Sequence, residues 1–391
     1  MKIVSVTRIL DDRGRFVFPE EARKTLDLKD DLFLSIDNAK QIIHVSKNGH
    51  GVKRTLDESG RLSLPSDYLQ QLNWKSGSEI GLYIEGVKGI LQEKAPSCVI
   101  CGSNQTLLKV KKTLVCNDCI QTGNEAMVNK WADMLENLLK EYKGYCDDAV
   151  SFKDTEDVHK SRTKGRRLRT LIHFIGVGKD HPLYERLKKA HDALGKVREE
   201  DVFIESFEKE AETNSYGDVY REFTKEAGKK RDQHRKKLKK KLPDIIDEKF
   251  MSQFHSFLKN ELKNYILPLD ISSELQKQEK DFDKRVNNYH QVIAEEGKFT
   301  EEGIDALHEV RKKAKKLRYI YSYLDKLYSE DYKSNSKPYK KIQKKFGDII
   351  DLRDWLDEMD SLEVGSKEED VQSVRNELQQ RQKKFLEQIT L

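Results

Sequence analysis

Two stretches of this chain carry a histidine followed by cations at the same intervals. Positions 3, 7 and 10 after the histidine are basic in both copies: His159, Arg162, Arg166 and Arg169, and then His308, Arg311, Lys315 and Arg318. At about 100° per residue these positions span an arc of roughly 80° on a helix, so each set forms one stripe. Further cations widen the two stripes: Arg167, Lys312 and Lys316.

Such stripes are suited to binding phosphate groups. Like charges one turn apart oppose helix formation by roughly 0.2–0.5 kcal/mol per pair, and a bound anion reverses that repulsion. Arginine offers planar bidentate donors to phosphate oxygens, lysine offers a mobile charge, and histidine adds a donor whose pKa a phosphate would raise. Chance does not readily repeat these offsets opposite equal apolar faces, so we interpret the stripes as a built anion site rather than as solvated surface.

The segments after the stripes repeat as well. Lysine pairs lie seven and six residues before a glycine in each copy, and one further lysine follows the second pair: Lys188 and Lys189 before Gly195, and Lys340, Lys341 and Lys344 before Gly347. The run 229–241 (KKRDQHRKKLKKK) is equally cationic but has no twin. For that run, a solvated face and an anion site remain equal alternatives.

A phosphate-chain hydrolase or transferase is the competing interpretation. Phosphoryl transfer needs metal-binding carboxylates, a phosphate loop, or a nucleophile with its base. The sequence contains no G-x-x-x-x-G-K-[ST] motif and no metal-ligand cluster beside the stripes. We therefore expect binding without catalysis.

Four cysteines form two C-x-x-C pairs separated by a hairpin-length spacer: Cys98, Cys101, Cys116 and Cys119. This is the usual spacing of a tetrahedral zinc site. Because sulfur fills all four positions, no coordination site is left for water, and we expect structural zinc in a small ribbon over 96–121. Cys146 has no partner of this kind.

The first 95 residues contain a tandem repeat. Arg8–Arg15 (RILDDRGR) recurs as Arg54–Arg61 (RTLDESGR) at an offset of 46 (54 − 8), and a proline follows each copy at equal distance. Each copy alternates short strands with Asp/Gly turns. We expect a β-rich unit built from copies 1–48 and 49–95.

The composition sets the elements that hold these residues. Charged residues make up 36% of the 391 positions, the net charge is +5 and the mean hydropathy is −0.79, yet apolar residues recur with helical period from about residue 126. We expect an all-α duplicated bundle with about four helices per half (126–241 and 243–391), with helices near 155–176, 181–211, 302–328 and 336–361 and a break at Pro243. The N-terminus resembles no signal peptide and no apolar run reaches the roughly 18 residues of a membrane span, which predicts a cytoplasmic protein with no membrane partner.

The paired stripes resemble the conserved histidine α-helical domain (CHAD) family. VHKSRTKGRRLRTLIHF and LHEVRKKAKKLRYIYSYL are similar to its H-x-x-R-x-x-x-[RK]-[RK]-L-R repeats, and KKAHDALGKVREEDV and YKKIQKKFGDIID are similar to its partner helices. The resemblance covers roughly 126–391 and implies binding of inorganic polyphosphate without hydrolysis. Lys315 stands where Arg166 does, and Phe346 precedes Gly347 where leucine is common, so the halves need not contribute equally.

VTRILDDRGRFVFPEEARKTLDL is similar to the swapped-hairpin DNA-binding modules of the AbrB and MazE type. The resemblance implies that the tandem copies form a pseudo-dimer within one chain, that an oligomer through this unit is possible, and that duplex DNA is a partner. It implies DNA contacts at Arg8, Arg15, Arg23, Lys24, Arg54 and Arg61. Copy two has Leu69 and Gln70 where Arg23 and Lys24 stand, so a scaffold or protein-interaction unit remains the alternative. Together these features suggest a regulator or adaptor that links polyphosphate to DNA.

Overall fold

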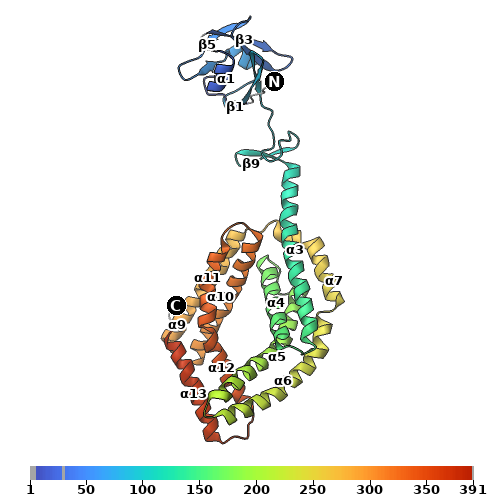
Figure 1. The fold of residues 1–391 in the computed structure, drawn as a ribbon, viewed down its shortest axis with the longest axis vertical. Helices are drawn as coiled ribbons and strands as arrows, with labels where there is room; N and C mark the ends of the chain where they lie inside the picture. The colour runs from blue at the N-terminus through green and yellow to red at the C-terminus, as the bar shows by residue number, and fades with distance from the viewer. Residues whose placement is uncertain (1–5, 29–30, 390–391) are drawn as a thin grey trace. The chain divides into compact units, whose positions relative to one another are not determined.

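A computed structural model describes residues 6–28 and 31–389. The chain divides into two compact units, Met1–Thr122 and Gly123–Leu391 (Figure 1). The first is β-rich and the second is helical, which confirms the expected multidomain order of a small β-rich part followed by a helical part. None of the helices in the described residues combines the length and apolar character needed to span a bilayer.

A six-stranded antiparallel sheet forms most of the first unit, in the order β1-β7-β8-β4-β3-β5, and a separate two-stranded ladder joins β2 to β6. Two short helices follow prolines in equivalent places, α1 (Glu20–Thr25) after Pro19 and α2 (Ser66–Gln71) after Pro65. The strands are β1 (Val6–Ile9), β2 (Arg15–Val17), β3 (Asp31–Asp37), β4 (Ile42–Ser46), β5 (Val52–Thr55), β6 (Arg61–Ser63), β7 (Glu79–Glu85) and β8 (Lys88–Glu93).

The two sequence copies exchange strands. β1 of copy one pairs with β7 of copy two, and β5 of copy two pairs with β3 of copy one. In the β2–β6 ladder Phe16 lies opposite Leu62, its own counterpart (62 − 16 = 46), and both side chains are fully buried. The long strands β3 and β7 are offset by 48 (79 − 31), so copy two carries two extra residues between its helix and its long strand.

A short hairpin carries the cysteine segment. β9 (Leu107–Val110) pairs with β10 (Thr113–Cys116), and α3 (Asn117–Ala149) begins at the next residue. The helix therefore starts before residue 126, where the amphipathic pattern becomes clear, and includes Cys119 in its first turn.

The helical unit contains α4 (Thr155–Phe174), α5 (Pro182–Thr213), α6 (Gly217–Ile245), α7 (Glu248–Ser256), a π-helical turn (Phe257–Glu261), α8 (Leu262–Ile266), α9 (Ile271–Glu295), α10 (Glu301–Leu327), α11 (Tyr332–Lys345), α12 (Gly347–Asp360) and α13 (Glu368–Glu387). Side chains cap the stripe helices, since Asp154 accepts from the backbone of Glu156 and Thr300 accepts from that of Gly303. The apolar faces opposite the stripes are buried, as the periodicity predicts: Leu168, Leu171, Ile172, Leu317, Ile320 and Leu324.

Two helix boundaries differ from the sequence expectation. The single helix expected over 336–361 is two helices, because α11 ends at Lys345, Phe346 (φ −94°, ψ −3°) is a turn residue, and Gly347 begins α12. The break expected at Pro243 is wrong, because α6 continues to Ile245. A proline so near the helix end removes one hydrogen bond without stopping the last turn.

Candidate anion-binding site

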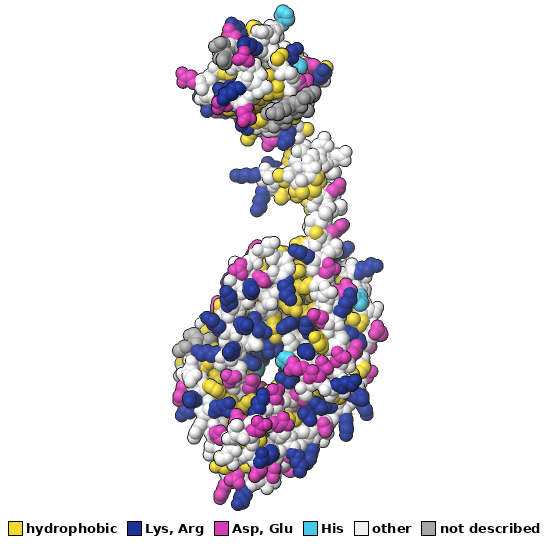
Figure 2. Space-filling view, viewed as in Figure 1, with side chains coloured by type: hydrophobic (Ala, Val, Ile, Leu, Met, Phe, Trp, Pro, Cys, Tyr) yellow, Lys and Arg dark blue, Asp and Glu magenta, His cyan; other side chains and the backbone are white. Residues whose placement is uncertain are grey.

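The two stripes meet where α4 packs against α10. Lys315 of α10 interacts electrostatically with Arg166 and Arg162 of α4, and with Arg311 and Arg318 of its own helix. Arg169 interacts with both Arg162 and Arg166. We call these six residues the basic cluster: Arg162, Arg166, Arg169, Arg311, Lys315 and Arg318. Figure 2 shows Lys and Arg side chains gathered on the visible face of the helical unit.

The cluster has almost no compensating acid. Within the described chain its one ion pair joins Arg162 Nη2 to Glu199 Oε1, at 3.3 Å. Asp351 interacts favourably with Arg311 and Lys315, but its burial raises the pKa of this carboxyl group. Within the part of the chain that the structure describes, the Nε atoms of Arg162 and Arg311 are buried without a hydrogen-bond partner. Buried donors and uncompensated charge are costly, and an anion would satisfy both.

The lowered pKa values of the cluster reflect the electrostatic cost of holding these cations together. Burial, followed by the neighbouring guanidinium groups, lowers the pKa of Lys315 to about 6. Burial and Arg162 lower the pKa of Arg166 to about 10. The cluster therefore favours loss of positive charge when no anion balances it.

In each stripe, one arginine packs against a glycine of the neighbouring helix, a position that we call a glycine seat. A Cβ added at Gly195 of α5 would lie 3.3 Å from Arg162 Nη2, and one added at Gly347 of α12 would lie 3.6 Å from Arg311 Nη2. At Gly195 the missing side chain leaves room for the guanidinium beside the helix, whereas a Cβ at Gly347 would make an ordinary contact. In both halves, the repeated glycine therefore lies beside an arginine of the stripe.

The two stripe histidines lie at the margin of the cluster. Burial lowers the pKa of His159, with a further contribution from Arg198. Burial and Arg353 lower the pKa of His308 to about 4. Both imidazoles are therefore poised to stay neutral unless negative charge arrives beside them.

Sequence reasoning missed His191, which α5 turns toward the cluster. Burial, then Arg162, Arg166 and Arg169, lower the pKa of His191 to about 2. Its Nδ1 is buried and has no hydrogen-bond partner among residues 6–28 and 31–389. The same holds for Oε1 of Gln343, the residue in the same place before Gly347. A repeat in the sequence could have identified His191. Both partner helices carry an amide or imidazole four residues before the glycine and an acid four residues after it.

The remaining expected residues lie around the cluster. Arg167 and Arg318 pack over the ring of Tyr319, at 5.4 and 4.9 Å, and Arg169 packs over Tyr184 at 5.8 Å. Lys312 is engaged by Glu309. The other lysines are exposed on α5, α10 and α11: Lys188, Lys189, Lys316, Lys340, Lys341 and Lys344.

The untwinned run 229–241 has a different setting on α6. Arg235 contacts Asp201 at 3.1 Å, and Lys230 contacts Glu358 at 2.6 Å and Glu200 at 3.4 Å. The side chains of Glu200 and Asp201 are only 3% and 1% exposed. The first part of the run therefore compensates buried acids. The second part, Lys236 to Lys241, contains exposed lysines.

The four cysteines of the first unit come together. Their Sγ atoms all lie within 4.8 Å of one another, and Cys101 and Cys116 are 3.5 Å apart. Tetrahedral coordination with Zn–S bonds of about 2.3 Å places sulfur atoms about 3.8 Å apart, so the four thiols fit a metal ion. Hydrogen bonds among the thiols raise the pKa of Cys119, and burial followed by the Cys101 thiol raises that of Cys116. Backbone hydrogen bonds lower the pKa of Cys98 to about 6.

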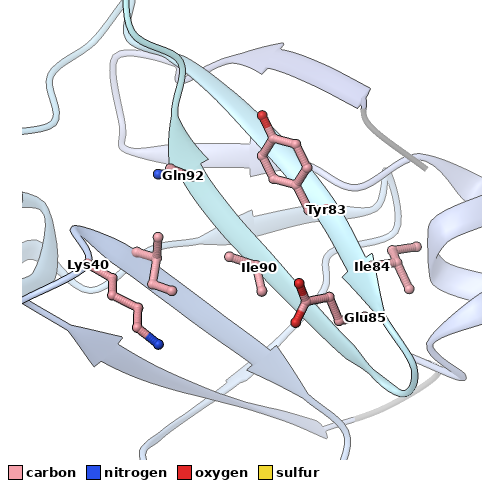
Figure 3. A pocket seen from close by; sticks show the side chains of 7 residues that line it. Lys40, Tyr83, Ile84, Glu85, Ile90 and Gln92 are labelled. Carbon is pink, nitrogen blue, oxygen red and sulfur yellow. The ribbon is translucent and has the colours of Figure 1, made fainter. Parts of the chain in front are cut away.

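The basic residues of the β-rich unit are spread over several elements. Arg8 is exposed on β1 and Arg54 is half-buried on β5, whereas Arg15 pairs with Asp11 at 2.7 Å and Lys24 pairs with Glu20 at 2.7 Å. Arg23 packs against Gly60, close to Arg61 in sequence. A pocket on this unit is lined instead by Lys40, Ile42, Tyr83, Ile84, Glu85, Ile90 and Gln92 (Figure 3).

Comparisons with known proteins bear on the helical unit. Among solved structures, the chain is similar to the crystal structure of the CHAD domain from the plant Ricinus communis, with 18% identity, a TM-score of 0.46, and coverage of 68% of this chain and 92% of that chain. No curated protein matches the chain by sequence. The family model of the CHAD domain matches residues 132–360, more than half of the chain, and the protein therefore belongs to the CHAD domain family.

Proposed function

We propose that the helical unit binds inorganic polyphosphate without chemical change. The observation that carries this proposal is the basic cluster, in which two stripes from distant parts of the sequence meet with one ion pair for six cations in the described chain. Membership of the CHAD domain family supports the same ligand. A chain of phosphates presents repeated negative charge that could contact both stripes at once.

The competing function is hydrolysis or transfer of phosphate groups. Magnesium-assisted phosphoryl transfer needs carboxylates grouped around the metal. Of the residues the structure describes, only the four cysteines form a group of three or more side chains placed to share a metal ion. The acids beside the cluster, Glu199 and Asp351, instead face Arg162 and Arg311. This arrangement favours binding over turnover.

Binding and phosphate release should be measured together on the full-length protein, with long-chain polyphosphate and Mg²⁺. We expect saturable binding whose affinity falls steeply between about 50 and 200 mM salt, because bound counterions are released, and no release of phosphate. Turnover abolished by substitutions in the basic cluster would support the hydrolase or transferase instead. Absence of binding at low salt would overturn the proposal.

For the cysteine cluster we propose a structural zinc ion that holds β9, β10 and the start of α3 together. The supporting observation is the fit of four Sγ atoms to tetrahedral spacing. We expect about one zinc per chain, and loss of metal on Cys98→Ser or Cys116→Ser with the helical content retained. Metal-free protein after reducing, chelator-free purification would refute this.

We propose that the first unit binds duplex DNA, which would make the protein a regulator or adaptor. The supporting observation is the exchange of strands between the two copies, which builds a pseudo-dimer inside one chain. Arg8→Glu with Arg54→Glu in the full-length protein should abolish a gel shift at about 50 mM salt, while polyphosphate binding persists. A protein that shifts no duplex at all would favour the scaffold interpretation.

A further inference from the structure

Lys315 and Arg166 occupy twin positions, seven residues after the histidine of each stripe. The two side chains are not equivalent, because a guanidinium keeps its proton in proteins whereas a buried ammonium group can lose it. We propose that Lys315 makes polyphosphate binding proton-coupled: its amine is neutral while the basic cluster is empty and takes a proton from solvent when a phosphate chain binds. This inference rests on the proposed function and adds its regulation by pH.

The geometry of the cluster opposes a charge on Lys315 in the empty protein. The side chain is half-buried between Arg162 and Arg166 of α4 and Arg311 and Arg318 of α10. Among the described residues it has no ion pair. Four guanidinium groups that cannot discharge leave the amine as the group that gives up its proton.

A lysine two residues earlier shows how this helix pairs a buried lysine side chain with an acid. The side chain of Lys313 is only 7% exposed, and its Nζ lies 2.7 Å from Asp281 Oδ2 and 2.6 Å from Gln278 Oε1. In the described chain, Lys315 has no such carboxylate partner. The difference lies in the partners rather than in the residue type.

Other titratable groups face Lys315 from the packed helices. His159 on α4 and His191 on α5 both interact with it unfavourably when charged, and burial lowers the pKa of each. Asp351 on α12 interacts favourably, and burial raises the pKa of its carboxyl group, but within the described chain it forms no ion pair with Lys315. None of these groups replaces the missing anion.

Linkage fixes the sign of the effect. Burial and the guanidinium groups lower the pKa of Lys315 to about 6, and a phosphate chain would raise it again by favouring the ammonium. Between the two pKa values, binding takes up a proton and affinity falls as pH rises, by up to about tenfold per pH unit for one proton. A phosphate would also raise the pKa of the histidines from a free value near 6.5, so measurements at pH 8 limit their proton uptake, and Lys315→Arg, which keeps them, isolates that of Lys315.

The test is calorimetric titration of the full-length protein with long-chain polyphosphate at pH 8, in Tris and in HEPES, whose ionisation enthalpies differ. Internal phosphates of a long chain hold no proton at this pH, so a buffer-dependent heat reports uptake by the protein. Wild type should take up a large fraction of a proton per bound site. Lys315→Arg should bind with little uptake, and its affinity should change less than about twofold between pH 7 and 9.

The matched control is Arg166→Lys, which places a second amine at the twin position and should increase proton uptake. If Lys315→Arg fails to fold, this variant and wild type still decide the question. Buffer-independent heat in wild type, or equal uptake in Lys315→Arg, overturns the inference while leaving polyphosphate binding intact. Absence of binding in every variant overturns the proposed function, and the inference with it.

Discussion

Two cationic regions of the helical unit have similar sequences and opposite surroundings. In the basic cluster, the described residues supply one ion pair, from Arg162 to Glu199. In the first part of the run on α6, Lys230 and Arg235 contact the buried acids Glu200 and Asp201. The two regions even share a helix, because α5 carries Glu199 toward one and Glu200 and Asp201 toward the other.

The comparison shows that charge density alone does not identify a binding site. Cations with buried acid partners complete the fold, and removing one leaves an uncompensated charge. Cations that gather without acid partners cost stability until a ligand supplies the missing charge. We therefore expect substitutions in the two regions to have opposite consequences for stability and binding.

The largest expected effect is on binding, from charge reversal in either stripe. Arg162→Glu with Arg166→Glu, or Arg311→Glu with Lys315→Glu, should weaken polyphosphate binding by at least about a hundredfold, since each lost contact to a charged group is worth about 1.5–3 kcal/mol. Titration calorimetry at about 100 mM salt measures the loss.

The matched control neutralises exposed cations of the α6 run, with Lys236, Lys239 and Lys240 changed to serine. We expect affinity to change by less than about threefold, mostly through screened long-range attraction. An equal loss from this control and from the stripes would mean that bulk positive charge, not a built site, attracts the ligand.

The second expected effect is on stability, from Arg235→Ala. Asp201 would keep only the 3.7 Å contact of Arg231, so a side chain 1% exposed would lose its nearest partner. We expect the free energy of unfolding in urea to fall by about 2–3 kcal/mol, below the roughly 3–5 kcal/mol of a fully broken buried pair. Polyphosphate affinity of the folded protein should stay within about twofold, and Asp201→Ala in the same chain should restore part of the stability.

The third effect is a pH dependence of the empty protein. The pKa of Lys315 is about 6 in the folded state, against about 10.4 when unfolded, so the unfolded state binds more protons between these values and stability rises with pH there. Lys315→Met should flatten this rise. It should also raise the melting temperature at pH 7, by roughly 2–4 °C for each kcal/mol of repulsion removed. Unchanged melting at both pH 7 and pH 9 would contradict the repulsion.

The sequence predicted the stripes but not their meeting. Periodicity alone placed the cations of α4 and α10 on one face and Leu168 and Leu317 on the other, because both follow from 3.6 residues per turn. The convergence of the stripes depends on how α4 packs against α10, which no local pattern specifies. For the same reason the inward turn of His191 was missed, although its position before Gly195 repeats at Gln343.

In the β-rich unit, the spacing of residues predicted the repeat and its turns but not which strands pair. β1 pairs with β7 rather than with a strand of its own copy, and the two copies differ by two residues before their long strands. Register arises from contacts distant in sequence, such as the pairing of Phe16 with Leu62. The helix break at Phe346 was missed because the apolar period continues across it.

The smallest effect compares the two glycine seats. An Ala side chain at Gly195 would lie 3.3 Å from Arg162 Nη2 and equally close to Glu199 Oε1, whereas at Gly347 it would lie 3.6 Å from Arg311 Nη2, an ordinary contact. Gly195→Ala should therefore shift the guanidinium by a few tenths of an ångström and weaken polyphosphate binding by about two- to fivefold. It should also stabilise the protein by up to about 1 kcal/mol, because alanine favours the interior of α5.

Gly347→Ala should leave affinity unchanged within error, because Arg311 keeps its place. Its gain in stability should be smaller, since Gly347 is the first residue of α12. An equal loss of affinity in both variants would show that the two seats are equivalent and that the asymmetry between the stripes rests on Lys315 alone.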